Sequence, residues 1–160
     1  MAREYNVLAT NVTAGAITMV FVNPGTTATL EFLRAWLSQA GSATSAQQRC
    51  QLSTQVTAFP TLTTITPSKT KLLDPASVIV GGTTGAAGTS GIVASAEGAG
   101  GKSVVYSDSF NVLNGWLWVP TPVDTIMMNA SAASGLGLFL PAAPTSAVNW
   151  TAGMTYRELG

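Results

Sequence analysis

The chain of 160 residues contains no histidine and a single cysteine, Cys50. Histidine is the usual general base near neutral pH, and together with cysteine it supplies most zinc ligands. The nucleophile pairs that depend on histidine and the common zinc sites are therefore excluded. We expect no enzymatic activity, no catalytic residue, no metal and no cofactor. No disulfide can form within the chain, and Cys50 is expected to be a small buried apolar residue.

Charge is almost as scarce as histidine. Seven Lys and Arg residues balance seven Asp and Glu residues, so only 9% of the chain is charged and its net charge is zero. Binding to nucleic acid or to an anionic membrane needs a basic surface, and we expect neither partner. A neutral, weakly charged surface is also prone to association. We therefore expect much of it to be covered by other protein.

Long apolar runs are missing as well. No stretch approaches the roughly 18 apolar residues of a membrane span. The first six residues lack the apolar region of a secretory signal. We therefore expect a soluble protein made in a cytosol. With 46% hydrophobic residues, the chain can bury one substantial core, which predicts a single domain over residues 1–160.

Short segments of alternating or clustered apolar residues, separated by Pro, Gly and Asn, predict strands. These segments are Tyr5–Ala9, Ile17–Val22, Gln47–Thr57, Leu62–Thr66, Val78–Val80, Val123–Met128, Leu136–Leu140 and Val148–Arg157. Many short strands without a clear helix indicate an all-β fold. The expected architecture is a single-domain antiparallel β-sandwich or jelly roll.

Two segments are less direct to interpret. In Thr29–Gln39, Leu30, Leu33 and Leu37 have helical spacing, whereas Leu30, Phe32 and Trp36 share the parity of a strand. We assign a strand because the neighbouring segments are β-like. Residues 81–101 hold eight of the sixteen glycines, and we predict one long Gly-rich surface loop there that becomes ordered against a partner.

The strongest local signal is Phe110–Pro120, where Asn114-Gly115 predicts a type I′ turn and a two-stranded hairpin. Opposite residues then share a side of the ribbon. One side is expected to face the core, and it consists of Phe110, Val112, Leu117 and Val119. The other side is either a second packing layer within the chain, which we favour, or an interface. Its members are the candidate interface residues Asn111, Leu113, Trp116 and Trp118.

Two patterns could carry chemistry. Residues 96–103, AEGAGGKS, differ from a phosphate-binding loop at Ala96, where that motif requires glycine. The motif also needs a following helix, but Val104–Tyr106 continues as a strand, so we do not expect nucleotide binding. Three carboxylates could serve glycoside cleavage, yet their spacing singles out no catalytic pair. They are Asp74, Asp108 and Asp124.

The layout of the chain resembles that of small structural proteins of tailed phages, namely head decoration (cement) proteins of the β-sandwich or jelly-roll kind. The resemblance is carried by short motifs spread over most of the chain. These are Phe110-Asn111, Asn114-Gly115-Trp116, Pro120-Thr121-Pro122, Ala86-Ala87-Gly88-Thr89, Ala46-Gln47 and the closing Tyr156-Arg157-Glu158.

The resemblance implies a virion protein, made in the host cytoplasm, that binds the outer surface of a phage head. Its partners would be the major capsid protein, whose neighbouring subunits it holds together, and itself, as a homotrimer. Residues 1–6, as an N-terminal arm, and residues 81–101 match by position the segments that reach adjacent subunits. The alternatives are a phage tail or fibre component and, from another class, a carbohydrate-binding β-sandwich module in which Trp116 and Trp118 stack on a sugar.

Overall fold

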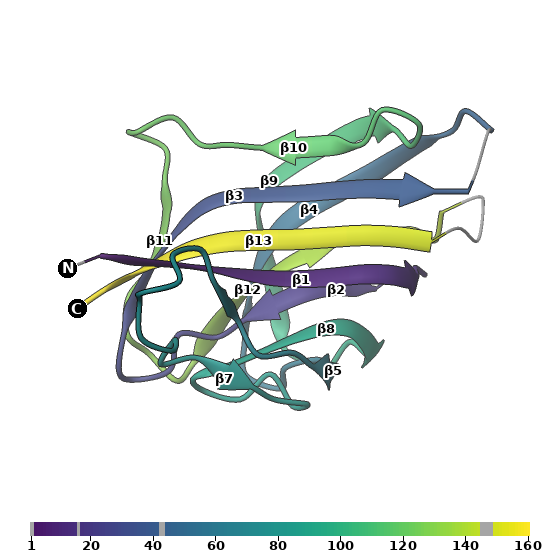
Figure 1. Ribbon diagram of the computed structural model, residues 1–160. Coiled ribbons are helices and arrows are strands. Elements are labelled where there is room, and N and C mark those ends of the chain that lie inside the picture. The colour runs from purple at the N-terminus through teal and green to yellow at the C-terminus, as the bar shows by residue number, and fades with distance from the viewer. Residues whose placement is uncertain (1, 16, 42–43, 145–148) are drawn as a thin grey trace.

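The computed structural model describes residues 2–15, 17–41, 44–144 and 149–160. Within these residues the protein has strands and turns and no helix. Two antiparallel sheets pack face to face (Figure 1), so the predicted all-β, single-domain sandwich is confirmed. One short strand pair, β7 with β8, is parallel.

The first sheet has six strands, and its long central strands run nearly the whole length of the molecule (Figure 1). Its order is β10 (Trp116–Trp118), β3 (Thr29–Ala40), β13 (Asn149–Leu159), β1 (Arg3–Thr13) and β6 (Ser68–Lys69). A further strand, β11 (Ile126–Met128), pairs with the beginning of β3 beside β10. The sheet therefore ends in β10 and β11 on one side and in β6 on the other.

The second sheet has seven strands. Its order is β5 (Thr61–Thr64), β8 (Thr89–Ala96), β2 (Thr18–Val22), β12 (Ser134–Phe139), β4 (Gln47–Val56) and β9 (Gly101–Asn111), with β7 (Val80–Gly81) paired to β8. The strand β9 pairs only with β4. It therefore forms an edge of this sheet.

The main core lies between the sheets and contains the largest buried side chains, including Tyr5, Phe32, Leu52, Trp150 and Tyr156. A smaller cluster of Phe21, Leu62 and Ala94 covers the other face of the second sheet. Because β2 contributes to both, all five of its residues are buried. Cys50 is also buried in the main core, as expected for a single cysteine in this sequence.

The ambiguous segment Thr29–Gln39 is a strand, as expected. Its buried residues are Leu30 and Phe32, followed by Ala35 and Leu37. Between these pairs the register with β13 shifts at Leu33, which is a β-bulge. The shift turns Trp36 out of the core, against its expected parity with Leu30. The Arg34 guanidinium lies over the outward-facing indole, 5.2 Å from the ring centroid.

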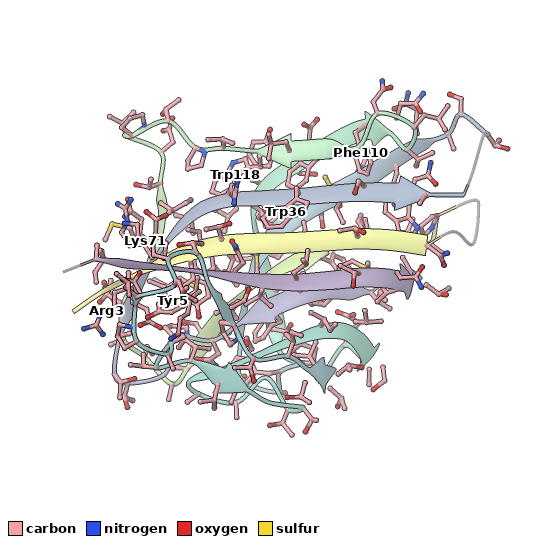
Figure 2. The ribbon with its side chains drawn as sticks, in the orientation of Figure 1. Arg3, Tyr5, Trp36, Lys71, Phe110 and Trp118 are labelled. Carbon is pink, nitrogen blue, oxygen red and sulfur yellow. The ribbon has the colours of Figure 1, made fainter. Side chains whose placement is uncertain are left out.

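The expectation of an N-terminal arm over residues 1–6 is wrong for the residues that are described. Arg3 to Asn6 belong to β1, where Arg3 pairs with Glu158 and Tyr5 pairs with Tyr156. Tyr5 is completely buried (Figure 2). Backbone pairing with β13 on one side and with β6 on the other, together with burial of an aromatic ring, holds this segment in the sheet. Met1 lies outside the described residues.

The prediction of one long Gly-rich loop over residues 81–101 is also wrong. The middle of this segment is β8, which pairs with both β2 and β5. Some of its glycines serve close packing, because a Cβ atom added at Gly91 would lie 2.6 Å from the Leu62 Cβ. Others form turns, such as Gly85 with a φ of 59° and Gly88 with a φ of 71°.

The expected hairpin over Phe110–Pro120 does not form. The predicted type I′ turn is wrong as well, because it requires a positive φ at both Asn114 and Gly115, and only Gly115, with a φ of 70°, has one. The turn that does form lies just before it, with the Asn114 N–H donating to the Asn111 carbonyl at 3.0 Å. The turn carries the chain from β9 in the second sheet to β10 in the first, so the two segments do not pair with each other. Phe110 and Val112 are buried as expected, whereas Leu117 and Val119 are exposed.

Most of the remaining predicted strands are confirmed with small changes in their bounds. The Val78–Val80 prediction is wrong for Val78 and Ile79, because β7 begins only at Val80. The Val123–Met128 prediction holds only for its second half, where β11 begins at Ile126. The last predicted strand begins at Val148, which lies outside the described residues, and its described part is β13.

Candidate functional site

The four candidate interface residues do not share one face. Trp116 and Trp118 point into the sandwich from β10 and are only 7% and 8% exposed. Leu113 is exposed on the turn before β10. Asn111 organises that turn, because its side-chain oxygen accepts from the Leu113 N–H at 3.0 Å and its amide donates to Ser45 at 2.6 Å. The structure therefore brings the tryptophans together and separates them from the other two residues.

The two indoles close one open side of the sandwich. Tyr106 reaches them from β9, with ring centroids 6.3 Å from Trp116 and 6.2 Å from Trp118. The Trp116 Nε1 also donates to the Asp108 Oδ2 of β9 at 3.2 Å. These contacts join the edge strand of one sheet to the edge strand of the other. We call Tyr106, Trp116 and Trp118 the aromatic clasp.

Burial of the indoles bears on sugar binding, since a stacking platform must offer an exposed ring face. Trp116 and Trp118 offer almost none. Of the aromatic clasp, only Tyr106 is substantially exposed.

Cys50 lies opposite Asp108 in the pairing of β4 with β9. Burial, and to a smaller degree the Asp108 carboxylate, raises the pKa of its thiol to about 12. A thiol with this pKa is protonated at neutral pH and is a poor nucleophile. Cys50 is therefore part of the core and does not provide a reactive group.

A groove opens beside the aromatic clasp, with a volume of about 720 Å³. We call it the edge groove, because its walls are the edge strand β9 and the segment from β10 to β11. It is lined by Thr54, Val105, Tyr106, Trp118, Val119, Pro120, Thr121, Asp124, Thr125, Ile126, Met127 and Met128. The sequence did not predict this groove.

A bulge in β9 shapes the groove wall. Leu52 pairs with Tyr106 and Ser53 pairs with Val104, so Val105 is an extra residue in β9. Consecutive residues of a strand normally point to opposite faces, but here Val105 and Tyr106 both line the groove. The groove rim is apolar and exposed at Val105, Val119 and Met127.

Asp124 is the one charged residue in the groove lining. It is exposed, and its Oδ2 accepts a hydrogen bond from the Thr121 hydroxyl at 2.5 Å within the turn between β10 and β11. In the described part of the chain it forms no ion pair. The groove therefore combines apolar side chains with threonine hydroxyls and one negative charge.

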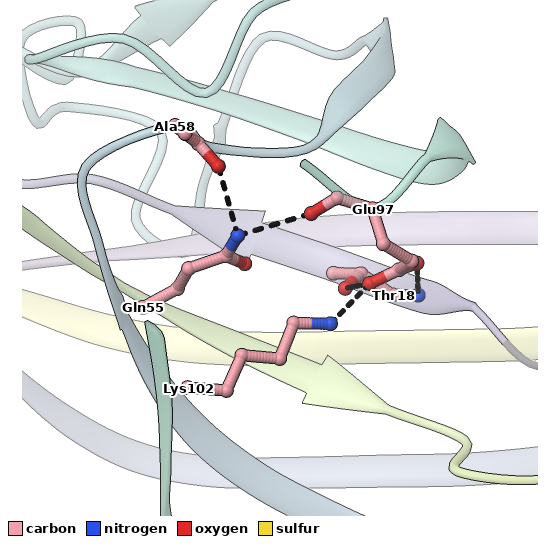
Figure 3. A network of polar contacts seen from close by, with 5 residues as sticks. All are labelled: Thr18, Gln55, Ala58, Glu97 and Lys102. Carbon is pink, nitrogen blue, oxygen red and sulfur yellow. Dashed lines mark hydrogen bonds and ion pairs between the residues drawn. The ribbon is translucent and has the colours of Figure 1, made fainter. Parts of the chain in front are cut away.

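The segment resembling a phosphate-binding loop has a structural role. Gly101, Lys102 and Ser103 begin β9, which continues through Val104–Tyr106 as expected, so no helix N-terminus is available to bind a phosphate. Lys102 forms an ion pair with Glu97, whose carboxylate also accepts from the Thr18 N–H and hydroxyl (Figure 3). Gln55 donates to the carbonyls of Ala58 and Glu97. This network fastens the β8–β9 turn to the beginning of β2.

The three carboxylates considered for glycoside cleavage lie in three different places. Asp108 contacts the aromatic clasp, Asp124 lies in the edge groove, and Asp74 follows the turn after β6. No group of three or more His, Cys, Asp or Glu side chains comes together in the described ranges.

A second feature that the sequence did not single out is the turn after β6. Leu72 and Leu73, at its tip, are 91% and 97% exposed. The only sequence signal was two adjacent apolar residues before the turn residues Asp74-Pro75.

Comparisons with known protein families, with curated proteins and with solved structures find no match to this chain. None of the described segments forms a helix with the length and apolar character needed to span a membrane.

Proposed function

We propose that the protein is a virion structural protein that decorates the outer surface of a phage head. There it binds the major capsid protein as a homotrimer and stabilises contacts between neighbouring capsid subunits. The proposal joins the physical character of the surface to the phage-like layout of the sequence. It assigns a contact function and no chemistry.

The observation that carries the proposal is the composition of the surface. Within the described residues, fourteen large apolar side chains are exposed, as many as all the charged residues of the chain. Three of them, Val105, Val119 and Met127, line the edge groove. Exposed apolar surface with little charge around it is typical of protein–protein contact sites. On a shell, many such contacts add through multivalency.

Cosedimentation with undecorated phage heads tests this function. We expect the protein to enter the pellet with the shells and to saturate at a fixed number of copies per shell. Binding should persist in about 1 M NaCl, because apolar contacts are not screened by salt. Absence of the protein from the shell pellet at both low and high salt would overturn the proposal.

A second measurement tests stabilisation separately from binding. Shells saturated with the protein should lose their integrity at a higher temperature than bare shells, because a ligand that binds only the assembled state stabilises it. Unchanged shell melting despite binding would contradict the stabilising role. Cosedimentation with isolated tails, or retention on immobilised glycans, would favour the tail or carbohydrate-binding alternatives instead.

A further inference from the structure

The turn after β6 presents two leucines to solvent on a rigid base. We call Lys71, Leu72 and Leu73 the leucine knob. On one side, the Thr70 N–H and hydroxyl donate to the Glu4 carbonyl at 3.1 and 3.0 Å. On the other, the Tyr5 hydroxyl donates to the Pro75 carbonyl at 3.1 Å. Exposure of two adjacent leucines on a turn held at both ends indicates a preorganised anchor for another protein.

The knob and the edge groove lie on opposite edges of the first sheet. Lys69 of β6 pairs with Tyr5, which pairs with Tyr156. Tyr156 pairs with Phe32, which pairs with Ile126 of the groove wall. The pairings therefore place Lys69, at the base of the knob, and Ile126, in the groove wall, on opposite edges of the sheet, four strand spacings or about 19 Å apart. Because hydrogen bonds hold both ends of the knob to β1, we expect contact between knob and groove to form between two copies.

The two surfaces also match in chemistry. The knob offers two exposed leucines beside the positive charge of Lys71, and the groove offers an apolar wall beside the negative charge of Asp124. Neither Lys71 nor Asp124 forms an ion pair within the described residues. Figure 2 labels Lys71 of the knob and Trp118 of the groove.

We propose that the protein self-associates head to tail, with the leucine knob of one copy inserted into the edge groove of the next. Leu72 and Leu73 contact the apolar wall at Val119 and Met127, and Lys71 lies beside Asp124. Such an interface is heterologous, and it closes into a ring when the rotation between successive copies permits. This inference rests on the proposed homotrimer, and it identifies the surfaces through which neighbouring copies contact each other.

Changes at the knob test the contact in the absence of shells. The double variant Leu72→Ser/Leu73→Ser should raise the dissociation constant of the oligomer by about a factor of ten or more, measured by sedimentation equilibrium. Leu113→Ser makes the same exposed change away from both surfaces and should have no effect. Circular dichroism should show both variants folded. An unchanged dissociation constant in the knob variant, or a wild type that stays monomeric, would overturn the inference.

Charge exchange tests the pairing of Lys71 with Asp124. Lys71→Glu and Asp124→Lys should each weaken association, because each places like charges together across the contact. The protein carrying both changes should recover association, since the attraction is restored with its direction reversed. Failure of the combined variant to associate better than either single variant would contradict the proposed register.

Mixing tests whether the contact is heterologous. The knob variant Leu72→Ser/Leu73→Ser retains an intact groove, and the groove variant Met127→Lys retains an intact knob. An equimolar mixture should therefore form a heterodimer that cannot grow further. Absence of that heterodimer would exclude knob-in-groove insertion. Shell binding is measured separately, so its loss would count against the proposed function while leaving the solution contact in place.

Discussion

Trp116 and Asp108 come from edge strands of different sheets, and the indole Nε1 donates to the carboxylate Oδ2 at 3.2 Å. The hydrogen bond joins β10 to β9 at the side of the sandwich where the edge groove opens. Because Asp108 is exposed while Trp116 is buried, the bond lies at the boundary between core and solvent. The same hydrogen bond therefore stabilises the fold and holds together the two strands beside which the groove opens.

Replacing Asp108 with Ala should destabilise the protein by about 1 kcal/mol, because the indole N–H loses its acceptor but remains near water. Trp116→Phe and the combined variant complete a double-mutant cycle, which urea unfolding can measure. We expect a coupling energy between the two sites. Asp124→Ala removes an exposed carboxylate that joins no sheets, and it should leave the free energy of unfolding unchanged. Strict additivity of the Trp116 and Asp108 changes would contradict the bond.

Stability at alkaline pH should depend on Cys50. The thiol pKa is raised from 9.0 to about 12, first by burial and then by Asp108. The folded state therefore favours the neutral thiol, and this contribution is complete below pH 9.0 and is lost as the pH rises towards 12. Burial raises the pKa of Tyr156 as well, so part of the alkaline dependence should remain without Cys50.

Thermal melts from pH 8 to pH 11 can separate these contributions, since the range spans the ordinary thiol pKa. Cys50→Ala should show a shallower loss of stability above pH 9.0 than the wild type. Alkylation of the wild-type thiol at pH 8 should also require unfolding. Rapid alkylation of the folded protein would contradict the burial of Cys50.

The network around Glu97 should contribute more through its backbone and hydroxyl bonds than through its ion pair (Figure 3). Glu97→Ala removes the acceptor for the Thr18 N–H and hydroxyl and should cost about 2–3 kcal/mol. Lys102→Met removes the partly exposed ion pair and the contact of the ammonium with the Phe139 ring, 3.9 Å from its centroid, and should cost only about 1 kcal/mol. Denaturant unfolding of both variants checks the order. Equal losses would show that the charge pair is the dominant interaction.

How far the fold could be predicted depends on whether local pattern or tertiary packing decides each element. Tyr5 and Val7 alternate with more polar residues, and both are buried as a strand pattern predicts. The bulge at Leu33 shifts the alternation in β3, so the inward-facing residues have even numbers before it and odd numbers after it. The buried Leu30 and Leu37 are therefore seven residues apart, a spacing that also fits a helix. A turn near Asn114 and Gly115 was predicted, but it is not of type I′, and its flanking strands pair elsewhere.

The edge groove could not be predicted for the same reason. Its walls combine Val105 and Tyr106 of the second sheet with Val119, which follows β10, and Met127 of β11 in the first sheet. No pattern within either segment of the sequence indicates that the two segments lie side by side in the fold. The tryptophans were correctly recognised as exceptional, and the preferred expectation of packing within the chain agrees with their burial. Whether their small exposed parts also contact a partner stays a prediction.

Gly91 distinguishes a packed strand from the flexible loop that the glycine content of residues 81–101 suggested. A Cβ atom there would lie 2.6 Å from the Leu62 Cβ and 2.9 Å from the Gly82 carbonyl oxygen. Neither atom can move without shifting backbone, so Gly91→Ala should destabilise the protein by about 1–3 kcal/mol. At Gly101 the nearest atom would lie 3.9 Å away. Gly101→Ala is therefore the matched control, and thermal unfolding should show little change. If Gly91→Ala were tolerated as well as Gly101→Ala, the close packing of β8 against β5 would be wrong.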